Sequence, residues 1–346
     1  MSNQSTRQIV FRADGDSQIG LGHIMRCLAL SEMIGSIDQS VFAIQQPSPL
    51  VLQMLQQASF TVISLPKATD YQDDTSNFVK HLRGDEVVIL DGYFFKEAYQ
   101  KKVKQHCWKL LAIDDLAAWH QYADAVINHG GAVQISDYQA EPYTKFFLGT
   151  HYALLRKPFL EAAKSRAVSQ LASFSPQRIL INLGGADYEN ISHRITGILL
   201  NNPAIEHITV ILGAANPHAA SFSQYSQQGV QVCHSLTTEQ MVAAIQQCSL
   251  AVVSCSTISY EVATIGRPFV SILTADNQTY LQRFYQDNQL ALRTLEKDFI
   301  ADELISVLSE SPELVNASLI RQQYFFDGKS GERIAHFFKR CSRFIN

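Results

Sequence analysis

The chain has 346 residues, of which 46% are apolar and 17% are charged, and its formal net charge is −4. This length favours two domains, and the apolar content suffices for two cores, which excludes a largely disordered chain. Because no basic stripe is interleaved with aromatic residues, we expect no nucleic-acid partner.

The expected location follows from what the sequence lacks. The N-terminal stretch has no basic region followed by an apolar core, so we expect no secretory signal. No apolar run approaches the ~20 residues that span a bilayer, so we expect no integral membrane segment. The cysteines are scattered and include no Cys-x-x-Cys pair, so we expect buried thiols, no structural zinc and a cytoplasmic, reducing location. We also expect a monomer. The cysteines are Cys27, Cys107, Cys233, Cys248, Cys255 and Cys341.

The first half alternates short β-branched apolar runs with helical segments such as 50–58 and 96–106. This alternation predicts a parallel sheet with helices on both faces. In such sheets ligands bind beyond the carboxyl ends of the strands, so polar residues there are the candidates for a site. The predicted strands are 9–11, 41–44, 61–65, 87–90, 110–113 and 125–127.

The stretch from Arg12 to Arg26 joins the first predicted strand to a helix. Gly20 and Gly22 would let the backbone approach a ligand, and the helix start offers unpaired N–H groups. His23 stands at this helix start, where the positive end of the helix dipole disfavours a cationic imidazole. A neutral imidazole can accept a proton, so the pattern predicts that His23 is a catalytic base.

Other polar residues accompany this stretch. Asp14 is a candidate to orient His23 or the substrate, and Arg12 and Arg26 are candidates to complement a diphosphate. Polar groups also follow three later strands, as Asp91-Gly92-Tyr93, Asp114-Asp115 and Asn128-His129. A substrate contact is slightly favoured for Tyr93, a loop or capping role is favoured for Asp114-Asp115, and His129 is the second candidate histidine.

The polar segment 163–177 predicts a boundary between an N-terminal domain, 1–165, and a C-terminal domain, 166–346. A second alternating set follows, and the tail 314–340 reads as an amphipathic helix broken near Asp327-Gly328. We expect the last helix to pack back toward the N-terminal domain. The predicted strands are 178–183, 208–212, 230–233, 250–253, 269–273 and 290–293, and the predicted helices are 191–200, 238–248, 258–265, 278–287 and 302–309.

The second half has its own candidate loops after strands. Gly184-Gly185 with Asp187 precedes a helix, an arrangement that suits a phosphate or ribose. Ser256-Thr257 starts another helix and could hold a pyrophosphate, while Glu261, one turn later, could accept hydrogen bonds from a ribose diol. The amides of Asn277-Gln278 could reach a sugar.

Taken in order, these motifs resemble the UDP-2,4-diacetamido-2,4,6-trideoxy-β-L-altropyranose hydrolases of pseudaminic acid biosynthesis, relatives of GT-B glycosyltransferases such as MurG. The resemblance covers about residues 7 to 340, and no single motif is diagnostic. The motifs are Gly20-x-Gly22-His23-x-x-Arg26, Asp91-x-Tyr93, Asp114-Asp115, Gly184-Gly185-x-Asp187, Ser256-Thr257-x-x-x-Glu261 with Gly266-x-Pro268, and Asn277-Gln278.

The resemblance implies an α/β fold of the GT-B type, with two Rossmann-like domains whose parallel sheets face across a cleft. It implies hydrolysis of a UDP-sugar to UDP and free sugar by inversion, with no metal or other cofactor, in a pathway that serves surface glycans or flagellin. His23 would activate water. The sugar side would comprise Arg12, Asp14, Gly20, Gly22, Arg26, Tyr93, Asn277 and Gln278, and the UDP side Gly184, Gly185, Asp187, Ser256, Thr257 and Glu261.

The chain departs from the family pattern at two places. Ser254 and Cys255 stand where glycine is common before the Ser-Thr pair, and Ala186 stands where serine is frequent. Two alternatives to hydrolysis stay open. One is a GT-B glycosyltransferase that uses a UDP-N-acetylated sugar, and the other is a non-catalytic protein that binds nucleotide sugars.

Overall fold

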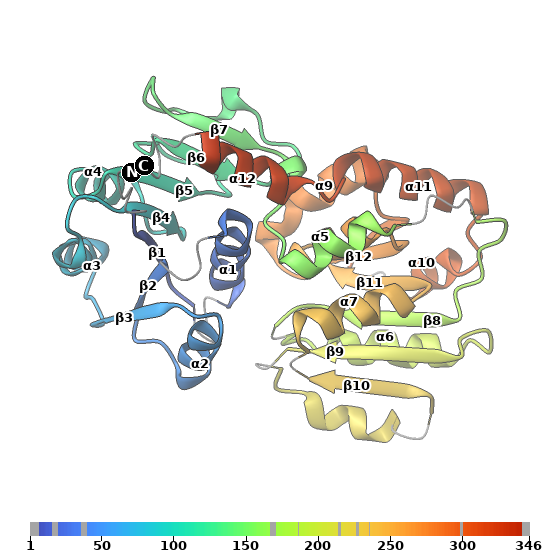
Figure 1. Cartoon of the computed structure of the whole chain (residues 1–346). Helices are drawn as coiled ribbons and strands as arrows, with labels where there is room; N and C mark the ends of the chain where they lie inside the picture. The colour runs from blue at the N-terminus through green and yellow to red at the C-terminus, as the bar shows by residue number, and fades with distance from the viewer. Residues whose placement is uncertain are drawn as a thin grey trace. The chain divides into compact units, whose positions relative to one another are not determined.

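The chain folds into two compact units, each built around one parallel sheet (Figure 1). A computed structural model describes residues 7–15, 20–35, 40–166, 171–185, 187–213, 216–225, 228–234, 236–297 and 300–340. Unit 1 contains the described residues up to Lys157 and from Lys329 onward, and unit 2 runs from Pro158 to Gly328. The division therefore falls at the start of helix α5 (Lys157–Lys164), and the chain returns to unit 1 for its last helix.

The described strands of unit 1 form a seven-stranded sheet in the order β3-β2-β1-β4-β5-β6-β7, with every neighbouring pair parallel. The six predicted strands are confirmed to within one or two residues at each end. The seventh was missed because it lies in a mixed aromatic segment without clear alternation. The strands are β1 (Ile9–Ala13), β2 (Ser40–Gln45), β3 (Thr61–Leu65), β4 (Val87–Asp91), β5 (Lys109–Ile113), β6 (Ala125–Asn128) and β7 (Lys145–Leu148).

Successive side chains of the unit 1 strands enter cores on opposite faces of the sheet. Val10 of β1 belongs to the core that is completed by α3 and α4. Its neighbour Phe11 points the other way, where its ring stacks on Phe42 and meets the edge of Phe60. The helices of this unit are α1 (Gly22–Ile34), α2 (Pro49–Gln57), α3 (Tyr71–Phe78), α4 (Glu97–Lys104) and α12 (Ser330–Arg340).

Helix α12 packs against α1 and the 3-10 turn η4 (Thr150–Tyr152), both in unit 1 (Figure 1). Its residues Ile334 and Phe338 are 2% and 1% exposed, and the ring of Phe337 lies 4.2 Å from that of Phe147 in β7. Ile334, Phe337 and Phe338 of α12 are thus packed within unit 1, whereas Leu314 and Ile320, earlier in the predicted tail, are exposed. Across the described residues, none of the helices has the length and apolarity that crossing a membrane requires.

The described strands of unit 2 form a six-stranded parallel sheet in the order β10-β9-β8-β11-β12-β13. One prediction was wrong: the last strand was placed at 290–293. Leu290 is buried in the turn that ends α9, where its N–H donates to the Tyr285 carbonyl, and the strand begins only at Arg293. The strands are β8 (Arg178–Asn182), β9 (His207–Leu212), β10 (Val230–His234), β11 (Leu250–Ser254), β12 (Phe269–Leu273) and β13 (Arg293–Glu296).

Side chains cap the start of some helices in both units. Ser48 caps α2 in unit 1, and Thr237 with Gln240 forms a capping box at α7 in unit 2. Ser311, followed by Pro312, starts α11. The helices after α5 are α6 (Ile191–Leu200), α7 (Thr238–Gln247), α8 (Thr257–Ile265), α9 (Thr279–Asp287), α10 (Ile300–Val307) and α11 (Pro312–Phe325).

In both sheets the strand order reverses beside the first strand of the unit. The reversal lies between β1 and β4 in unit 1 and between β8 and β11 in unit 2. Loops that leave such neighbouring strands turn toward opposite faces of the sheet, and ligands of open parallel sheets bind between these loops. The loops after β1 and β4 therefore flank one candidate ligand position, and the loops after β8 and β11 flank another.

The backbone is closely packed around Gly213, next to the loop that follows β8. A Cβ added to Gly213 would lie 2.3 Å from the carbonyl oxygen of Gly185, in the loop after β8. Backbone atoms must move to relieve such a contact, so we expect Gly213→Ala to lower the free energy of unfolding by about 1–3 kcal/mol. The urea midpoint of unfolding, measured by circular dichroism, checks this.

Gly185→Ala is the matched control, since a Cβ on Gly185 would meet nothing within 4 Å. It should leave the urea midpoint near that of the unmodified chain. Equal stability of Gly213→Ala and the unmodified chain would contradict the packing argument.

Candidate functional site

His23 lies in the first turn of α1, and its imidazole is held by the carboxylate that ends β4. His23 Nδ1 is 2.7 Å from Asp91 Oδ1, and Asp91 is fully buried. A carboxylate only accepts hydrogen bonds, so His23 Nδ1 carries the proton and donates it to Asp91. This tautomer leaves the lone pair on His23 Nε2, the nitrogen that can take a proton from a ligand.

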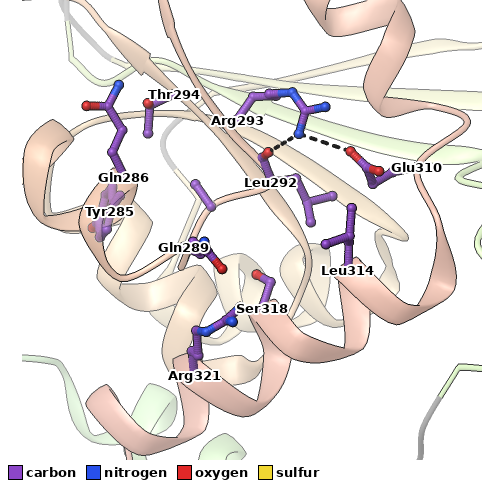
Figure 2. Close-up of a pocket in the computed structure, with 11 residues that line it drawn as sticks. Tyr285, Gln286, Gln289, Leu292, Arg293, Thr294, Glu310, Leu314, Ser318 and Arg321 are labelled. Carbon is purple, nitrogen blue, oxygen red and sulfur yellow. Dashed lines mark hydrogen bonds and ion pairs between the residues drawn. The ribbon is translucent and has the colours of Figure 1, made fainter.

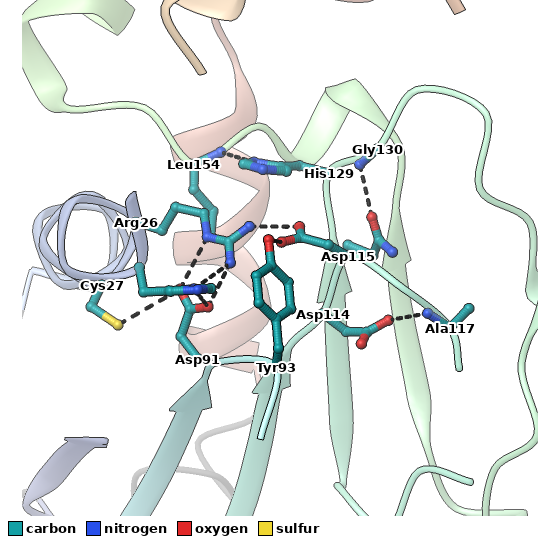
Figure 3. A network of polar contacts seen from close by, with 12 residues as sticks. Arg26, Cys27, Asp91, Tyr93, Asp114, Asp115, Ala117, His129, Gly130 and Leu154 are labelled. Atoms are coloured by element: carbon teal, nitrogen blue, oxygen red, sulfur yellow. Dashed lines mark hydrogen bonds and ion pairs between the residues drawn. The ribbon is translucent and has the colours of Figure 1, made fainter. Parts of the chain in front are cut away.

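Arg26, one turn further along α1, makes a bidentate ion pair with Asp91 (Figure 3). Its Nε and Nη2 donate to the two carboxylate oxygens at 3.0 and 2.6 Å, and its Nη1 donates to Asp115 at 2.5 Å. Two carboxylates thus face one guanidinium and leave one net negative charge next to His23.

Asp115 connects this pair to Tyr93. Burial alone would raise the pKa of Asp115, but the ion pair with Arg26 outweighs it and lowers the pKa to about 2. The Tyr93 hydroxyl donates to Asp115 at 3.3 Å, and the Tyr93 ring meets the His23 ring edge-on at 4.9 Å. Burial and the charge of Asp115 raise the pKa of Tyr93 to about 12, so the hydroxyl remains a donor at neutral pH.

The neighbouring carboxylates Asp114 and Asp115 have different surroundings. Asp114 accepts hydrogen bonds from the backbone N–H of Ala117 and from the Tyr138 hydroxyl, both at 2.8 Å. Burial raises the pKa of Asp114. The pair therefore divides: Asp114 holds its own loop, as expected for the pair, and Asp115 belongs to the His23 network.

His129, which follows β6, lies beside Asp115 in the same view (Figure 3). Its Nδ1 accepts a hydrogen bond from the Leu154 N–H at 3.2 Å. Burial and the nearby positive charge of Arg26 lower the pKa of His129 to about 4. This histidine is therefore neutral at neutral pH.

A second buried charge network lies at the ends of β1 and β2. Arg12 is fully buried, and it pairs with Asp14 at 2.6 and 2.8 Å and with Asp74 at 3.0 Å. Tyr99 of α4 donates to Asp74 at 2.8 Å, and the backbone N–H of Gln45 donates to Asp14 at 2.9 Å. These contacts fix the Asp14 carboxylate, whose side chain is 14% exposed.

Asp14 was expected to orient either His23 or the substrate, but the carboxylate that contacts His23 is Asp91. A substrate contact of Asp14 stays a prediction. Arg12 uses both terminal nitrogens on Asp14 and Asp74, so its direct role at a diphosphate also stays a prediction. What the contacts do establish is that Arg12 positions Asp14.

Gly20 and Gly22 stand at the start of α1. Gly20 has φ +80°, a left-handed conformation that favours glycine, and a Cβ on Gly20 or Gly22 would meet nothing within 4 Å. Leu21 precedes the helix, and no side chain caps its first N–H groups. No described residue therefore crowds Gly20 or Gly22; residues 16–19 lie outside the described part of the chain.

In unit 2, the start of α8 is the counterpart of the His23 loop. Ser256 precedes the helix, but its hydroxyl is paired with that of Ser254 at 2.8 Å and does not cap the backbone. The thiol of Cys255 is buried against the Ser271 hydroxyl at 2.7 Å, inside the sheet. The departure from glycine at Cys255 thus leaves the helix start to Ser256 and Thr257.

The loop after β8 contains a glycine with a required conformation and a carboxylate that caps a helix. Gly184 has φ +93°, in the left-handed region. Asp187 accepts hydrogen bonds from the backbone N–H groups of Ile191 and Ser192 at 2.8 and 2.9 Å, which satisfies the start of α6. Because a carboxylate already occupies that helix start, an anionic ligand fits better at α8. The UDP contacts of Gly184, Gly185 and Asp187 stay predictions.

The remaining expected residues of unit 2 lie on or after α8. Glu261 is half-buried on α8, one turn after Thr257. Gln278 accepts hydrogen bonds through Oε1 from the Thr274 N–H and hydroxyl at 3.0 and 3.1 Å. Asn277 lies in the 3-10 turn η6 (Asp276–Gln278), and its side chain lies outside the described part of the chain.

The sequence patterns missed the structural role of Asp91 and the whole Arg12 network. Asp91 had a signal, because it ends a strand two residues before Tyr93. Asp74 and Tyr99 had none, since their approach to Arg12 depends on how α3 and α4 pack. In the described residues there is no group of three or more His, Cys, Asp or Glu side chains arranged to hold a metal ion.

The low pKa of Asp115 predicts an acid-sensitive contribution to stability. A carboxyl whose pKa is lowered by folding stabilises the fold above its unfolded pKa, about 3.9, and this contribution is lost as the pH falls toward the folded value. We expect Asp115→Asn to reduce the free energy of unfolding by up to about 2 kcal/mol at neutral pH. The difference should shrink between about pH 5 and pH 2. Urea titrations across this range measure it.

Asp85→Asn is the control, because Asp85 is 58% exposed and pairs only loosely with Arg83 at 3.5 Å. It should change the free energy of unfolding little at any of these pH values. A difference for Asp115→Asn that stays constant down to pH 2 would contradict the assignment.

Comparison with solved structures identifies the class of fold. Acinetobacter baumannii MurG aligns with a TM-score of 0.64 at 12% identity, over 96% of this chain and 99% of MurG. The calicheamicin glycosyltransferase CalG4 aligns with a TM-score of 0.63 at 11% identity, over 96% and 98%. Anabaena HepE in complex with UDP and glucose gives a TM-score of 0.56 at 12% identity, over 96% and 99%. The fold is therefore α/β with two Rossmann-like units of the GT-B type, as expected.

Sequence comparison narrows the similarity to two curated proteins. The chain is 24% identical over 274 residues to the UDP-2,4-diacetamido-2,4,6-trideoxy-β-L-altropyranose hydrolase of Campylobacter jejuni, covering 78% of this chain and 93% of that enzyme. It is 25% identical over 294 residues to the uncharacterized protein MJ1062 of Methanocaldococcus jannaschii, covering 82% of this chain but only 58% of that protein. No family model matches. The resemblance expected from the ordered motifs is confirmed.

Proposed function

We propose that the chain hydrolyses a UDP-linked 2,4-diacetamido-2,4,6-trideoxyhexose to UDP and the free sugar. The observation that carries this proposal is the His23–Asp91 pair, which leaves His23 Nε2 as a proton acceptor beside an uncapped glycine loop. The similarity to the Campylobacter hydrolase supports the substrate class. In this proposal the free sugar enters pseudaminic acid synthesis in the cytoplasm, for surface glycans or flagellin.

In the proposed reaction His23 Nε2 takes a proton from water while the water oxygen attacks the anomeric carbon. The bond between that carbon and the UDP oxygen breaks, and its electron pair leaves with UDP. Attack opposite the leaving group inverts the anomeric configuration. Asp91 holds the imidazole by its other nitrogen and stabilises the imidazolium that forms, as the carboxylate does in Ser-His-Asp triads.

The proposed reaction needs a base for the attacking water but no acid for the departing UDP. UDP is a good leaving group, so no side chain has to protonate its oxygen, and metal-independent hydrolysis needs only donors to the diphosphate. We assign that part to the hydroxyls of Ser256 and Thr257 and to the N–H groups that start α8. Glu261 would accept hydrogen bonds from the ribose, while Tyr93 and the amides of Asn277 and Gln278 would contact the sugar.

A glycosyltransferase of the same fold is the second candidate, favoured by the structural likeness to MurG and CalG4. The two functions differ in whether water or another acceptor attacks the sugar. Incubation with the UDP-sugar alone, followed by NMR, separates them: hydrolysis gives UDP and free sugar of inverted configuration without an acceptor. Failure to release UDP from the authentic substrate would refute the hydrolase proposal.

His23→Asn and Asp91→Asn test the proposed base and its partner. Without the base we expect kcat to fall by about 10²–10⁴-fold. Asp91→Asn can turn the imidazole tautomer by offering a donor to His23 Nδ1, so a similar loss is expected. UDP affinity, measured by calorimetry, should stay within about twofold because UDP is assigned to unit 2. Undiminished turnover in His23→Asn would exclude His23 as the base.

Ser256→Ala and Thr257→Ala test the assignment of the diphosphate to α8. Each change removes one hydroxyl donor to a charged group, so we expect UDP binding to weaken by roughly tenfold. Ser223→Ala, which removes an exposed hydroxyl from another part of unit 2, is the matched control. Unchanged UDP affinity in both α8 variants would move the diphosphate away from this helix.

A further inference from the structure

Unit 2 contains a cavity of about 430 Å³ between the end of α9, the start of β13 and helix α11 (Figure 2). Pockets for small molecules usually fall between about 300 and 1,000 Å³, so this volume suits a ligand of sugar size. None of the residues assigned to the base, the sugar or UDP lines this cavity.

The cavity lies at the amino ends of the strands, whereas the proposed UDP contacts lie at their carboxyl ends. Ser254 is the last residue of β11, next to the proposed UDP contacts, and Arg293 is the first residue of β13 and lines the cavity. Helix α9 connects the two ends of the sheet, because it starts after η6 and contains the cavity residue Tyr285 near its end. A molecule in the cavity would therefore occupy a second site in unit 2.

The charged lining favours an anion. Arg293 shares one nitrogen, Nη1, between the Leu292 carbonyl at 2.7 Å and Glu310 at 3.0 Å. Arg321 of α11 also lines the cavity, and no hydrogen bond or ion pair links its guanidinium to another described residue. Two guanidinium groups against one carboxylate leave one net positive charge. Guanidinium groups bind carboxylate and phosphate through paired N–H donors.

The rest of the lining favours hydroxyl groups. Gln286 and Gln289 contribute exposed amides, and Figure 2 shows Gln289 beside Arg321. Such groups donate to and accept from the hydroxyls of a sugar. Ser318 also lines the cavity, but its hydroxyl donates to the Leu290 carbonyl at 2.7 Å and accepts from the Gln322 amide at 3.3 Å. Leu292 and Leu314 supply apolar surface for the C–H faces of a ring.

The turn at the end of α9 fixes where Gln289 lies. Helix α9 ends with the Leu290 N–H bonded to the Tyr285 carbonyl at 3.0 Å, and Gln289 takes the left-handed position of this turn with φ 48°. Glycine is the usual residue at such a helix end because it avoids strain. The chain instead places an amide there, directly in the cavity lining.

We propose that this cavity binds a hydroxyl-rich small molecule that carries one anionic group, a sugar phosphate or a sugar acid. Arg321 and Arg293 bind the anion, and the amides of Gln286 and Gln289 bind sugar hydroxyls. This site is separate from that of UDP and does not depend on the proposed hydrolysis.

Calorimetry on the full chain with glucose 6-phosphate, D-gluconate, inorganic phosphate and glucose tests the proposal. We expect at least one of the two anionic sugars to bind, more tightly than inorganic phosphate, and glucose not to bind. Preference for glucose 6-phosphate or for gluconate identifies phosphate or carboxylate as the anion. Binding should persist in saturating UDP. No binding of either anionic sugar, or its displacement by UDP, would overturn the proposal.

Variants locate the site. Arg321→Ala should weaken binding of the anionic sugar by roughly tenfold or more. Arg283→Ala is the matched control, because Arg283 is exposed on α9 and does not line the cavity. Gln289→Gly should retain or raise the thermal midpoint, since glycine relieves the left-handed strain, while it weakens binding. Full affinity in Arg321→Ala and Gln289→Gly would overturn the assignment to this cavity.

Discussion

The Arg26–Asp91 ion pair is the interaction on which the candidate site of unit 1 depends. Asp91 is fully buried, and a buried carboxylate is costly unless it is paired and hydrogen-bonded. Arg26 supplies the charge, and His23 supplies a further donor to the same carboxylate. The charge that stabilises the end of β4 therefore also fixes the tautomer of the proposed base, so stability and proposed chemistry rest on the same atoms.

Most of the fold could be predicted because its signals are local. Val87–Leu90 and Phe269–Leu273 are β-branched apolar runs bounded by polar residues, and both became strands with almost the predicted ends. The failures arise where apolar residues serve another element. Leu290 looks like the start of a strand, but it is buried in the turn that ends α9. Residues 145–148 form an edge strand whose pairing with β6 leaves little periodic signal.

The site was predictable only in part, because loops after strands can be found by pattern while side-chain partners depend on packing. The helix start marked His23, and the strand end marked Asp91 and Tyr93. Which carboxylate reaches the imidazole depends on the alignment of β1 with β4, and that alignment favours Asp91 over Asp14. The adjacent Asp114 and Asp115 have the same chemistry, and only the positions of Tyr138 and Arg26 distinguish their roles.

The return of α12 to unit 1 makes unit 2 an insertion within unit 1. Unit 2 is one continuous segment, whereas unit 1 is assembled from two segments on either side of it. Removing the chain from Lys329 onward would thus expose the faces of α1 and β7 that α12 covers, although these elements are far away in sequence. During synthesis, the N-terminal strands of unit 1 therefore leave the ribosome before unit 2. They can pack against α12 only after all of unit 2 has been made, so unit 1 is completed last.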